Sequence, residues 1–437
     1  MDKKYIELLK EFAAFKSIST SAKYKDDCKK CAEWMKTQFA ENGFEVEVIE
    51  GYGNPLVLAS YEVEDESAET VLIYGHYDVQ PAEKGDGWDS EPFELTEKDE
   101  RFYARGVMDD KGLVLIHMWT LFELLKSGKL KYNVKFLVEG DEETGSVGVT
   151  KFIEEYKDKL DSDFVLVSDG PQFENRPTLE VGYRGTFNLT LKLKTLDNDV
   201  HSGQYGGVTP NAAYELSHLL AHLMDGDKLN IPEVYEGLPG KEKVAKMTKD
   251  FDFDAKSYSE KTGAKMVFWE EGLNYFAQKG LRPAVEITGL NSGYVGEGYR
   301  NSIPAEATAK INFRLAEGQS VVKTIEGFRR FVEKYLPEYV QYEIETTAEP
   351  ISGYSVDTDN KYFSATEKLL EKVYGGKVFK NYVGGTIPII RNFMDILDVP
   401  TVSVPLANAD SGMHSVNENL TFEKVEKGLE FSEKFFS

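Results

Sequence analysis

The chain has 437 residues, of which 41% are hydrophobic and 29% are charged, and this length predicts two domains in an ordinary globular protein. Its 75 acidic and 51 basic residues give a formal charge of -24, so the surface would repel polyanions, and we expect neither nucleic acid nor a membrane as a partner. No apolar run approaches the roughly 20 residues of a membrane span, and the first twelve residues have the spacing of an amphipathic helix instead of a signal sequence, which together indicate a cytoplasmic protein.

Two cysteines, Cys28 and Cys31, fall in a segment, 27–39, that has the composition of a helix. A CxxC pair can be a redox centre or half of a zinc site, but a second CxxC is missing and the flanking residues are not those of a thioredoxin. We therefore expect two thiols on a surface helix, and so few cysteines exclude a disulfide scaffold.

From residue 45 onward, short runs rich in Val, Ile and Leu alternate with stretches of helical length, which predicts an α/β fold whose mostly parallel sheet is buried on both faces. The expected strands cover 46–49, 55–61, 70–78, 133–143 and 163–169, and the expected helices cover 112–128 and 148–159. In such sheets the reactive side chains follow the carboxyl ends of the strands.

After Gly182 the pattern changes to alternating apolar and polar residues, as in a sheet with one solvated face. Strands are expected at 187–195, 284–290, 307–315 and 342–346, with helices at 211–225 and 324–336. This predicts a smaller α+β domain with its helices on one face. From residue 360 the α/β pattern returns, so we assign residues 1–182 and 349–437 to one domain and 183–348 to an inserted domain, and we assign no role to the polar segment 225–262.

Carboxylates and imidazoles gather where five of the apolar runs end. They lie at 74–78, 108–111, 141–143, 168–169 and 410–414. Packing like charges together would cost on the order of several kcal/mol unless cations neutralised them. Two imidazoles with three or more carboxylates suit zinc or manganese, and a pair of such ions is a known hydrolytic arrangement.

Nine motifs, which run in order along almost the whole chain, resemble the M20 family of metallopeptidases and, within it, the carnosine-dipeptidase-like branch. They are GHYDVQP (75–81), WDSEPFEL (88–95), ARGVMDDKG (104–112), EGDEETGS (139–146), VSDG (167–170), GYRGT (182–186), DVHSGQYGG (199–207), GGTIP (384–388) and GMHSVNE (412–418). The resemblance implies a di-metal catalytic domain with an inserted lid and dimerisation domain.

The resemblance also implies a role for each residue of the centre. His76 and Asp169 would hold one divalent ion, Glu143 and His414 the other, and Asp109 would bridge both. Zinc is the default ion, and manganese is the alternative. Asp78 would orient His76, and Glu142 would be the general base.

Substrate contacts are implied in the inserted domain and in a late glycine-rich loop. Arg314 would bind the terminal carboxylate of a small peptide, with further contacts from Asn301, Gly384, Gly385 and Thr386, the last replacing the Ser that is common in the branch. His201 would complete the active site of the partner subunit in a homodimer. The simpler alternatives are an Arg314 paired with a neighbouring Glu and a His201 that caps the following helix at 210–211.

The leading hypothesis is a di-metal dipeptidase. An N-acyl amino acid deacylase or desuccinylase of the same family would share every metal ligand, and a non-catalytic binding protein that retains the fold is the alternative from another class. His218 and His222 lack the Glu of an HExxH site and are expected to be structural or surface residues, and His117 is expected to be a satisfied core residue. Neither a GxSxG nor a GxxxxGK[ST] motif occurs.

Overall fold

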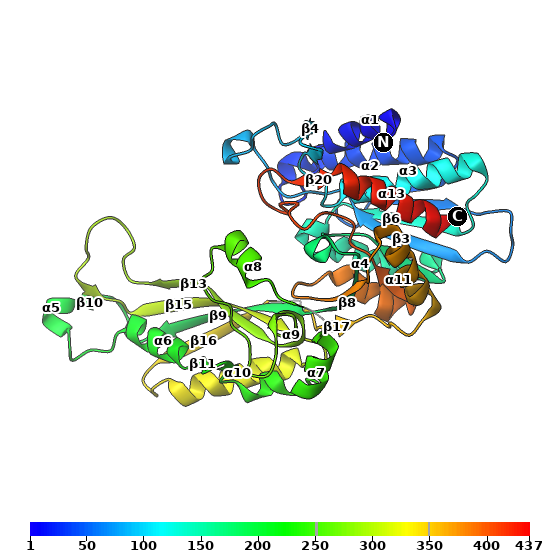
Figure 1. Cartoon of the computed structure of the whole chain (residues 1–437). Helices are drawn as coiled ribbons and strands as arrows, with labels where there is room; N and C mark the ends of the chain where they lie inside the picture. The colour runs from blue at the N-terminus through cyan, green and yellow to red at the C-terminus, as the bar shows by residue number, and fades with distance from the viewer. Residues whose placement is uncertain (250–251, 348–349) are drawn as a thin grey trace. The chain divides into compact units, whose positions relative to one another are not determined.

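The computed structural model describes residues 1–249, 252–347 and 350–437, so the predicted domain boundary between residues 348 and 349 lies outside the described residues. The chain forms two compact units (Figure 1). Unit 1 comprises Met1–Val181, Val356–Asn381 and Ile387–Ser437, and unit 2 comprises Gly182–Ser355 and Tyr382–Thr386. Unit 2 thus extends beyond the predicted range 183–348, because residues 382–386 pack against Arg184, whose Nε donates to the carbonyl of Gly384 (3.0 Å).

The larger sheet, most of whose residues belong to unit 1, has nine strands; its main path runs β1-β2-β6-β3-β7-β19-β8-β17, with β18 paired to β8. The four strands β6-β3-β7-β19 are parallel, whereas the pairs on either side of them are antiparallel. The strands are β1 (Glu45–Ile49), β2 (Leu56–Tyr61), β3 (Thr70–His76), β6 (Asn133–Glu139), β7 (Phe164–Val167), β8 (Thr178–Tyr183), β17 (Tyr354–Ser355), β18 (Phe379–Val383) and β19 (Thr401–Ser403). The predicted α/β fold class is confirmed, since the central apolar runs are buried on both faces as a covered parallel sheet requires.

Helices cover this sheet, and the most central of them is apolar on nearly all sides. They are α1 (Lys3–Ala13), α2 (Lys25–Glu41), α3 (Lys111–Ser127), α4 (Val147–Glu155), α11 (Lys361–Tyr374), α12 (Pro388–Asn392) and α13 (Phe422–Phe436). Because α3 packs against β3, α1 and α13, its residues are buried all around, as expected of a helix without a polar face. His117 of α3 is buried, and its Nδ1 lies 3.0 Å from the hydroxyl of Ser432.

Unit 1 also contains a separate small antiparallel sheet with the strand order β20-β5-β4. It consists of β4 (Thr96–Lys98), β5 (Arg101–Tyr103) and β20 (Asn419–Thr421). The chain leaves β5 and forms a loop before α3 begins at Lys111, and Asp109 lies in this loop. The expectation that residues 108–111 follow a strand of the parallel sheet was therefore wrong, because the strand before them, β5, belongs to the separate antiparallel sheet.

Unit 2 contains a four-stranded antiparallel sheet, β13-β15-β9-β16, covered on one face by two helices. The elements are β9 (Gly185–Lys194), β13 (Ala284–Ser292), β15 (Glu306–Leu315), β16 (Gln341–Thr346), α6 (Ala212–Ala221) and α10 (Val321–Tyr335). Alternate residues of β9 and β15 are buried and form one core with α6 and α10, so the predicted alternation indicated the correct architecture. The opposite face of the sheet carries the polar residues of these strands.

The rest of unit 2 consists of short elements. They are β10 (Val200–His201), α5 (Ser202–Tyr205), β11 (Met224–Asp225), β12 (Lys228–Leu229), α7 (Lys241–Thr248), α8 (Ala255–Thr262), α9 (Tyr275–Leu281) and β14 (Ser302–Ile303). The polar segment 225–262 thus forms helices and a hairpin in its described part, and α7 packs against α9.

One sequence-based expectation about the surface was wrong. Cys28 and Cys31 do lie on a helix, α2, but both side chains are fully buried free thiols and not surface groups. They face the interior because the buried side of α2 also carries Met35 and Phe39, which lie on the same helical face. Nowhere in the described ranges does a helix have both the length and the apolar character that crossing a membrane requires.

Candidate metal centre

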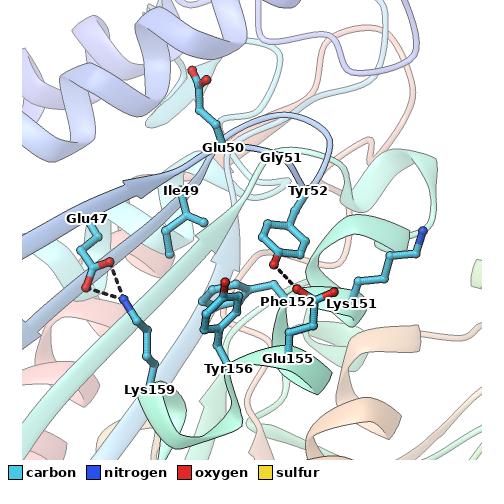
Figure 2. A pocket seen from close by; sticks show the side chains of 10 residues that line it. All are labelled: Glu47, Ile49, Glu50, Gly51, Tyr52, Lys151, Phe152, Glu155, Tyr156 and Lys159. Atoms are coloured by element: carbon cyan, nitrogen blue, oxygen red, sulfur yellow. Dashed lines mark hydrogen bonds and ion pairs between the residues drawn. The ribbon is translucent and has the colours of Figure 1, made fainter.

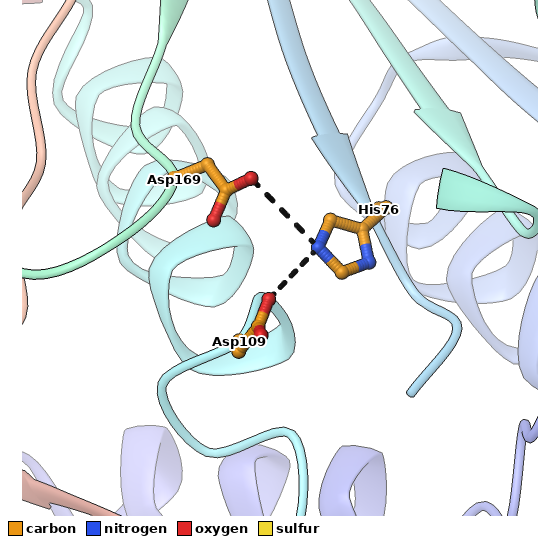
Figure 3. A group of neighbouring side chains, drawn as sticks. All are labelled: His76, Asp109 and Asp169. Carbon is orange, nitrogen blue, oxygen red and sulfur yellow. Dashed lines mark hydrogen bonds and ion pairs between the residues drawn. The ribbon is translucent and has the colours of Figure 1, made fainter. Parts of the chain in front are cut away.

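His76 and Asp169 follow two neighbouring parallel strands of the central sheet. β3 ends at His76, and β7 ends two residues before Asp169. Because β3 and β7 pair in parallel, the two side chains meet at one edge of the sheet. The Nε2 atom of His76 lies 3.1 Å from Oδ1 of Asp109 and 4.0 Å from Oδ2 of Asp169 (Figure 3). All three side chains are buried, so this edge holds a water-poor group of one imidazole and two carboxylates.

Asp109 also belongs to a second group of potential ligands. Its Oδ2 lies 2.9 Å from Nε2 of His414, and that nitrogen lies 3.3 Å from Oε2 of Glu143. Within each group, one ligand atom per residue lies within 4.8 Å of the others. The structure therefore brings all five predicted metal ligands together in two triads, and Asp109 is the residue that the triads share.

The charges in these triads explain why the cluster suits cations. Burial would lower the pKa of His76, but its hydrogen bonds to Asp109 and Asp78 raise that pKa well above its usual value. Hydrogen bonds to Asp109 and Glu143 raise the pKa of His414 to about 10. Burial raises the pKa of Asp169 to about 7. Carboxylates thus surround each imidazole and favour positive charge there, and once the rings give up their protons, the set of imidazole nitrogens and carboxylate oxygens fits zinc or manganese.

Asp78 contacts a residue of each triad, His76 in one and Glu143 in the other. Its side chain is fully buried, and its Oδ1 lies 3.3 Å from Nδ1 of His76. The same carboxylate accepts the backbone N–H groups of Glu142 and Glu143, each at 3.1 Å. Ser19 donates its hydroxyl to Asp78 Oδ2 at 2.6 Å. Asp78 therefore fixes the orientation of the His76 ring and the turn that carries Glu142 and Glu143.

Glu142 lies at this centre without belonging to either triad. It begins a short 3₁₀ turn, Glu142–Thr144, directly after the loop that follows β6. Burial raises its pKa well above the usual value, and the nearby charges of Asp169 and Asp109 add to this effect, whereas His76 opposes it. A carboxylate with a raised pKa can accept and hold a proton, which neither a ligand nor a surface glutamate does readily.

Gln80 and Ser19 contact residues of this centre but were not among the predicted site residues. Gln80 donates its amide to Oε2 of Glu143 at 2.6 Å, and it belongs to the quoted motif GHYDVQP, so the motif already contained the signal. Ser19 lies outside every quoted motif, and no sequence pattern indicated its contact with Asp78.

The residues expected to contact substrate lie in unit 2, and they form two separate groups. Arg314, near the end of β15, is half-buried on the helix-free face of the sheet and donates from Nε to Asn312 Oδ1 at 3.2 Å, so its described hydrogen bond goes to an amide and not to the neighbouring Glu that the alternative required. Burial and then the charge of Arg314 lower the pKa of Arg184 to about 10, which indicates two guanidinium groups at this end of the sheet. The loop 384–386 lies next to Arg184, since the hydroxyl of Thr386 donates to the carbonyl of Arg184.

His201 and Asn301 form the other group, beyond the opposite end of the sheet. The strands β10 and β14 pair so that His201 faces Ser302, and the carbonyl of Asn301 accepts from Ser202 at 3.1 Å. His201 is exposed, and its Nδ1 accepts from the backbone N–H of Gly203 at 3.0 Å. It caps α5 and not the helix at 210–211, where Asn211 performs that role for α6.

A surface pocket of about 510 Å³ lies elsewhere in unit 1 and contains none of the predicted site residues (Figure 2). Its wall is formed by the end of β1, the following loop and α4. The charged groups across it are largely paired with each other: Lys159 Nζ lies 2.6 Å from Glu47 Oε2, and the hydroxyl of Tyr52 donates to Glu155. This pocket therefore shows no convergent unpaired groups of the kind that bind a substrate.

Comparison with known proteins finds similarity along most of the chain. The model of peptidase family M20/M25/M40 matches residues 72–437. The human Beta-Ala-His dipeptidase is 29% identical over 391 residues, which cover 87% of this chain and 77% of that protein. The Cys-Gly metallodipeptidase DUG1 of Saccharomyces cerevisiae is 29% identical over 385 residues, covering 86% of this chain and 80% of that protein. Among solved structures, an M20 family metallo-carboxypeptidase of Sulfolobus solfataricus, Sso-CP2, superposes with a TM-score of 0.86 at 27% identity and covers 100% of this chain and 99% of its own.

Proposed function

The chain belongs to peptidase family M20/M25/M40, and we propose that it is a metal-dependent dipeptidase that cleaves dipeptides or short peptides with a free C-terminal carboxylate. The observation that carries this proposal is the pair of ligand triads that share the buried Asp109. Dipeptidases are among its relatives from human and yeast, and a metallo-carboxypeptidase is among its structural neighbours.

In this proposal His76 and Asp169 hold one divalent ion, Glu143 and His414 hold the other, and Asp109 contacts both. Two cations bound there would polarise the scissile carbonyl and make a water molecule more acidic. Zinc is the ion we propose, because mixed imidazole and carboxylate ligands suit it, and manganese is the alternative for a site so rich in carboxylates.

Glu142 is the proposed general base. Since it belongs to neither triad, its carboxylate is left to move a proton. It takes a proton from the attacking water and later gives that proton to the leaving nitrogen. Its raised pKa, caused first by burial, suits a group that must hold a proton between these two events. Asp78 keeps this base in place through the backbone N–H of Glu142.

The terminal carboxylate of the substrate is proposed to bind Arg314, beside Arg184 and the loop Gly384, Gly385 and Thr386. A guanidinium group matches a carboxylate in shape and charge, and the second guanidinium strengthens the positive field at the same place. Peptides that lack this carboxylate should therefore be poor substrates.

We further propose a homodimer in which His201, with Asn301, completes the site of the partner subunit. The exposed imidazole of His201 uses only Nδ1 in its described hydrogen bond, so Nε2 is left for an external acceptor. Such a donor would stabilise the oxyanion that forms on the scissile carbonyl.

A cytoplasmic location is proposed as well, since the free thiols Cys28 and Cys31 suit a reducing compartment, and fractionation of source cells tests this.

The decisive assay compares dipeptides with N-acetyl and N-succinyl amino acids, using metal-replete enzyme and the same enzyme after chelation. We expect hydrolysis of dipeptides that disappears on chelation and returns with added zinc or manganese. Activity confined to the acyl substrates would replace the dipeptidase by the deacylase. No activity of metal-replete enzyme on any substrate would favour the non-catalytic alternative.

A further inference from the structure

A buried carboxylate that plays no part in the proposed chemistry lies directly behind the shared ligand Asp109. Glu418 has no exposed surface, and four N–H groups point at it. Oε2 accepts from Arg105 Nη1 at 2.6 Å and from the backbone of Gly106 at 3.1 Å. Oε1 accepts from the backbone of Met108 at 2.9 Å and of Asp109 at 3.1 Å. One side chain thus fixes most of the loop that ends in Asp109.

Arg105 completes the connection on the other side. It is buried beside Glu418, and its Nη2 donates to the carbonyl of Ser415 at 3.2 Å. Its guanidinium group lies 5.3 Å from the ring centre of Trp88, a cation–π contact that limits its movement. Glu418 and Arg105 therefore connect the loop 105–109 to Ser415 and to the end of the loop 412–418.

The loop 105–109 is shaped for this contact. Gly106 has a φ of 82°, a conformation that favours glycine, and a side chain there would approach Val79 to 2.7 Å. The backbone N–H of Gly106 can point at Glu418 because the residue adopts this turn. The connection is thus built into the motif ARGVMDDKG as well as into the final motif GMHSVNE.

Each of the two connected loops carries one ligand of the same triad. Asp109 ends the first loop, and His414 lies in the second, 2.9 Å from Asp109. By contrast, His76 is the last residue of β3 and pairs with Glu139 of β6, and Asp169 lies two residues after the end of β7. The position of His414 relative to Asp109 therefore depends on the Arg105–Glu418 pair, whereas His76 and Asp169 have independent support.

We propose that Arg105 and Glu418 are positioning residues for the metal centre and that they act chiefly on the ion held by His414. This inference rests on the proposed function, in which the two triads hold two ions. Residues behind metal ligands commonly change metal affinity by about 10- to 100-fold when they are replaced. The pair would thus make the two sites unequal in their dependence on the surrounding loops.

The main test uses the Glu418→Gln variant after a chelator has removed its metal. The metal-free protein is titrated with zinc and with manganese, and calorimetry measures the binding. The introduced glutamine has the same shape as Glu418, but its amide NH₂ would face N–H donors and find no acceptor there. We expect one equivalent of metal to bind with the wild-type affinity and the second equivalent to bind at least about 10-fold more weakly. The second equivalent should be the one that the His414→Ala variant fails to bind. Excess metal should restore kcat without changing KM.

Glu270→Gln is the matched control. Glu270 is another buried carboxylate, 3.7 Å from the buried Arg282, but it lies in unit 2 and contacts none of the five ligands. It should bind both equivalents as the wild type does, even if its melting temperature falls. Comparing the metal-free melting temperatures of the two variants separates a general loss of stability from a loss of metal affinity.

A second variant covers the case in which Glu418→Gln does not fold. Arg105→Lys retains the charge and the three backbone hydrogen bonds to Glu418, and it should weaken the same equivalent by a smaller factor. The proposal is overturned if either folded variant binds both equivalents as tightly as the wild type, or if both equivalents weaken equally. A wild type that binds fewer than two ions would instead contradict the proposed function itself.

Discussion

Asp109 and Glu142 are carboxylates of one cluster, yet their surroundings give them different properties. Burial would raise the pKa of Asp109, but hydrogen bonds from His414 and His76 hold it below its usual range. Glu142 lacks such hydrogen bonds to its side chain among the described residues, and burial raises its pKa. Environments that separate the pKa values of neighbouring carboxylates also separate their roles, so Asp109 is suited to hold cations and Glu142 to carry protons.

This difference predicts opposite metal contents for two variants. Glu142→Gln should keep both ions and lower turnover by about two or more powers of ten, since the base is lost and the ligands remain. Asp109→Ala should lose both ions, because each triad contains Asp109. Metal analysis of the purified variants, together with their kcat values, checks both statements. A Glu142→Gln enzyme with wild-type turnover, or an Asp109→Ala protein with two equivalents of metal, would show that the roles are misassigned.

The two imidazoles predict that metal binding releases protons at neutral pH. In the metal-free protein the pKa of His414 is raised to about 10 and that of His76 lies well above its usual value, so both rings are protonated at pH 7. A ring nitrogen must be deprotonated to bind a metal, and affinity should therefore increase as pH rises toward these pKa values. Titration calorimetry in buffers of different ionisation enthalpy measures the protons released. Binding heats that do not vary with the buffer would contradict the prediction.

At the scale of secondary-structure elements, the periodicity of apolar residues predicted those features that follow from a local sequence pattern, namely the strands and the type of sheet they form. The alternation in 187–195 and 307–315 indicated the one-sided sheet of unit 2, and apolar runs indicated the central strands of unit 1. The loop before α3 could not be foreseen, because MDD after an apolar Val reads like a strand end and only the packing of β5 in a separate sheet shows otherwise. Likewise, the burial of Cys28 depends on which face of α2 meets the sheet.

The residues of the candidate metal centre were predicted for a different reason. They belong to motifs that are recognisable in the sequence, although these motifs lie far apart along the chain. Gln80 and Glu418 also belong to quoted motifs, but the groups that they and Ser19 contact follow from tertiary structure alone, since each contact joins residues that are distant in the sequence. Hydrogen bonds over such separations leave no local pattern in composition or spacing.

The helix-free face of the unit 2 sheet predicts how substrate specificity can be changed. Arg314→Ala should weaken binding of peptides with a free C-terminal carboxylate by about 2 to 5 kcal/mol, since a charge-assisted contact is lost. C-terminally amidated peptides should be nearly unaffected. The measurement is kcat/KM for matched free and amidated substrates. Arg330→Ala, which removes an exposed arginine of α10 paired with Glu233, is the control and should change neither. Equal losses for both substrates would exclude a carboxylate contact at Arg314.

At the scale of the whole molecule, the length of β15 separates the two groups of proposed substrate contacts. β15 runs from Glu306, near His201 and Asn301, to Leu315, next to Arg314. Ten residues of extended chain span about 30 Å, whereas a dipeptide is only about 7 Å long. A single small substrate cannot reach both ends of one sheet. If Arg314 and His201 contact the same dipeptide, they must come from different chains.

This separation leads to a prediction about mixed dimers. His201→Ala and Glu142→Gln should each be nearly inactive alone, because one lacks the oxyanion donor and the other lacks the base in every site. After subunit exchange, a mixed dimer contains one site with an intact Glu142 from one chain and an intact His201 from the other. Partial activity should therefore return on mixing, up to about half of the wild-type value per mixed dimer, since oxyanion stabilisation and proton transfer are again present together.

The experiment requires proof of exchange and one further control. Differently tagged chains, co-purified after mixing, show that mixed dimers have formed. Mixing His201→Ala with a second variant of the same chain position, such as His201→Asn, should restore nothing, because neither chain supplies the imidazole. Recovery in the first mixture alone places His201 in the partner's site. If no activity returns although exchange is demonstrated, His201 acts within its own chain or takes no part in the reaction, and the separation of about 30 Å along β15 would then leave Arg314 as the contact to reconsider.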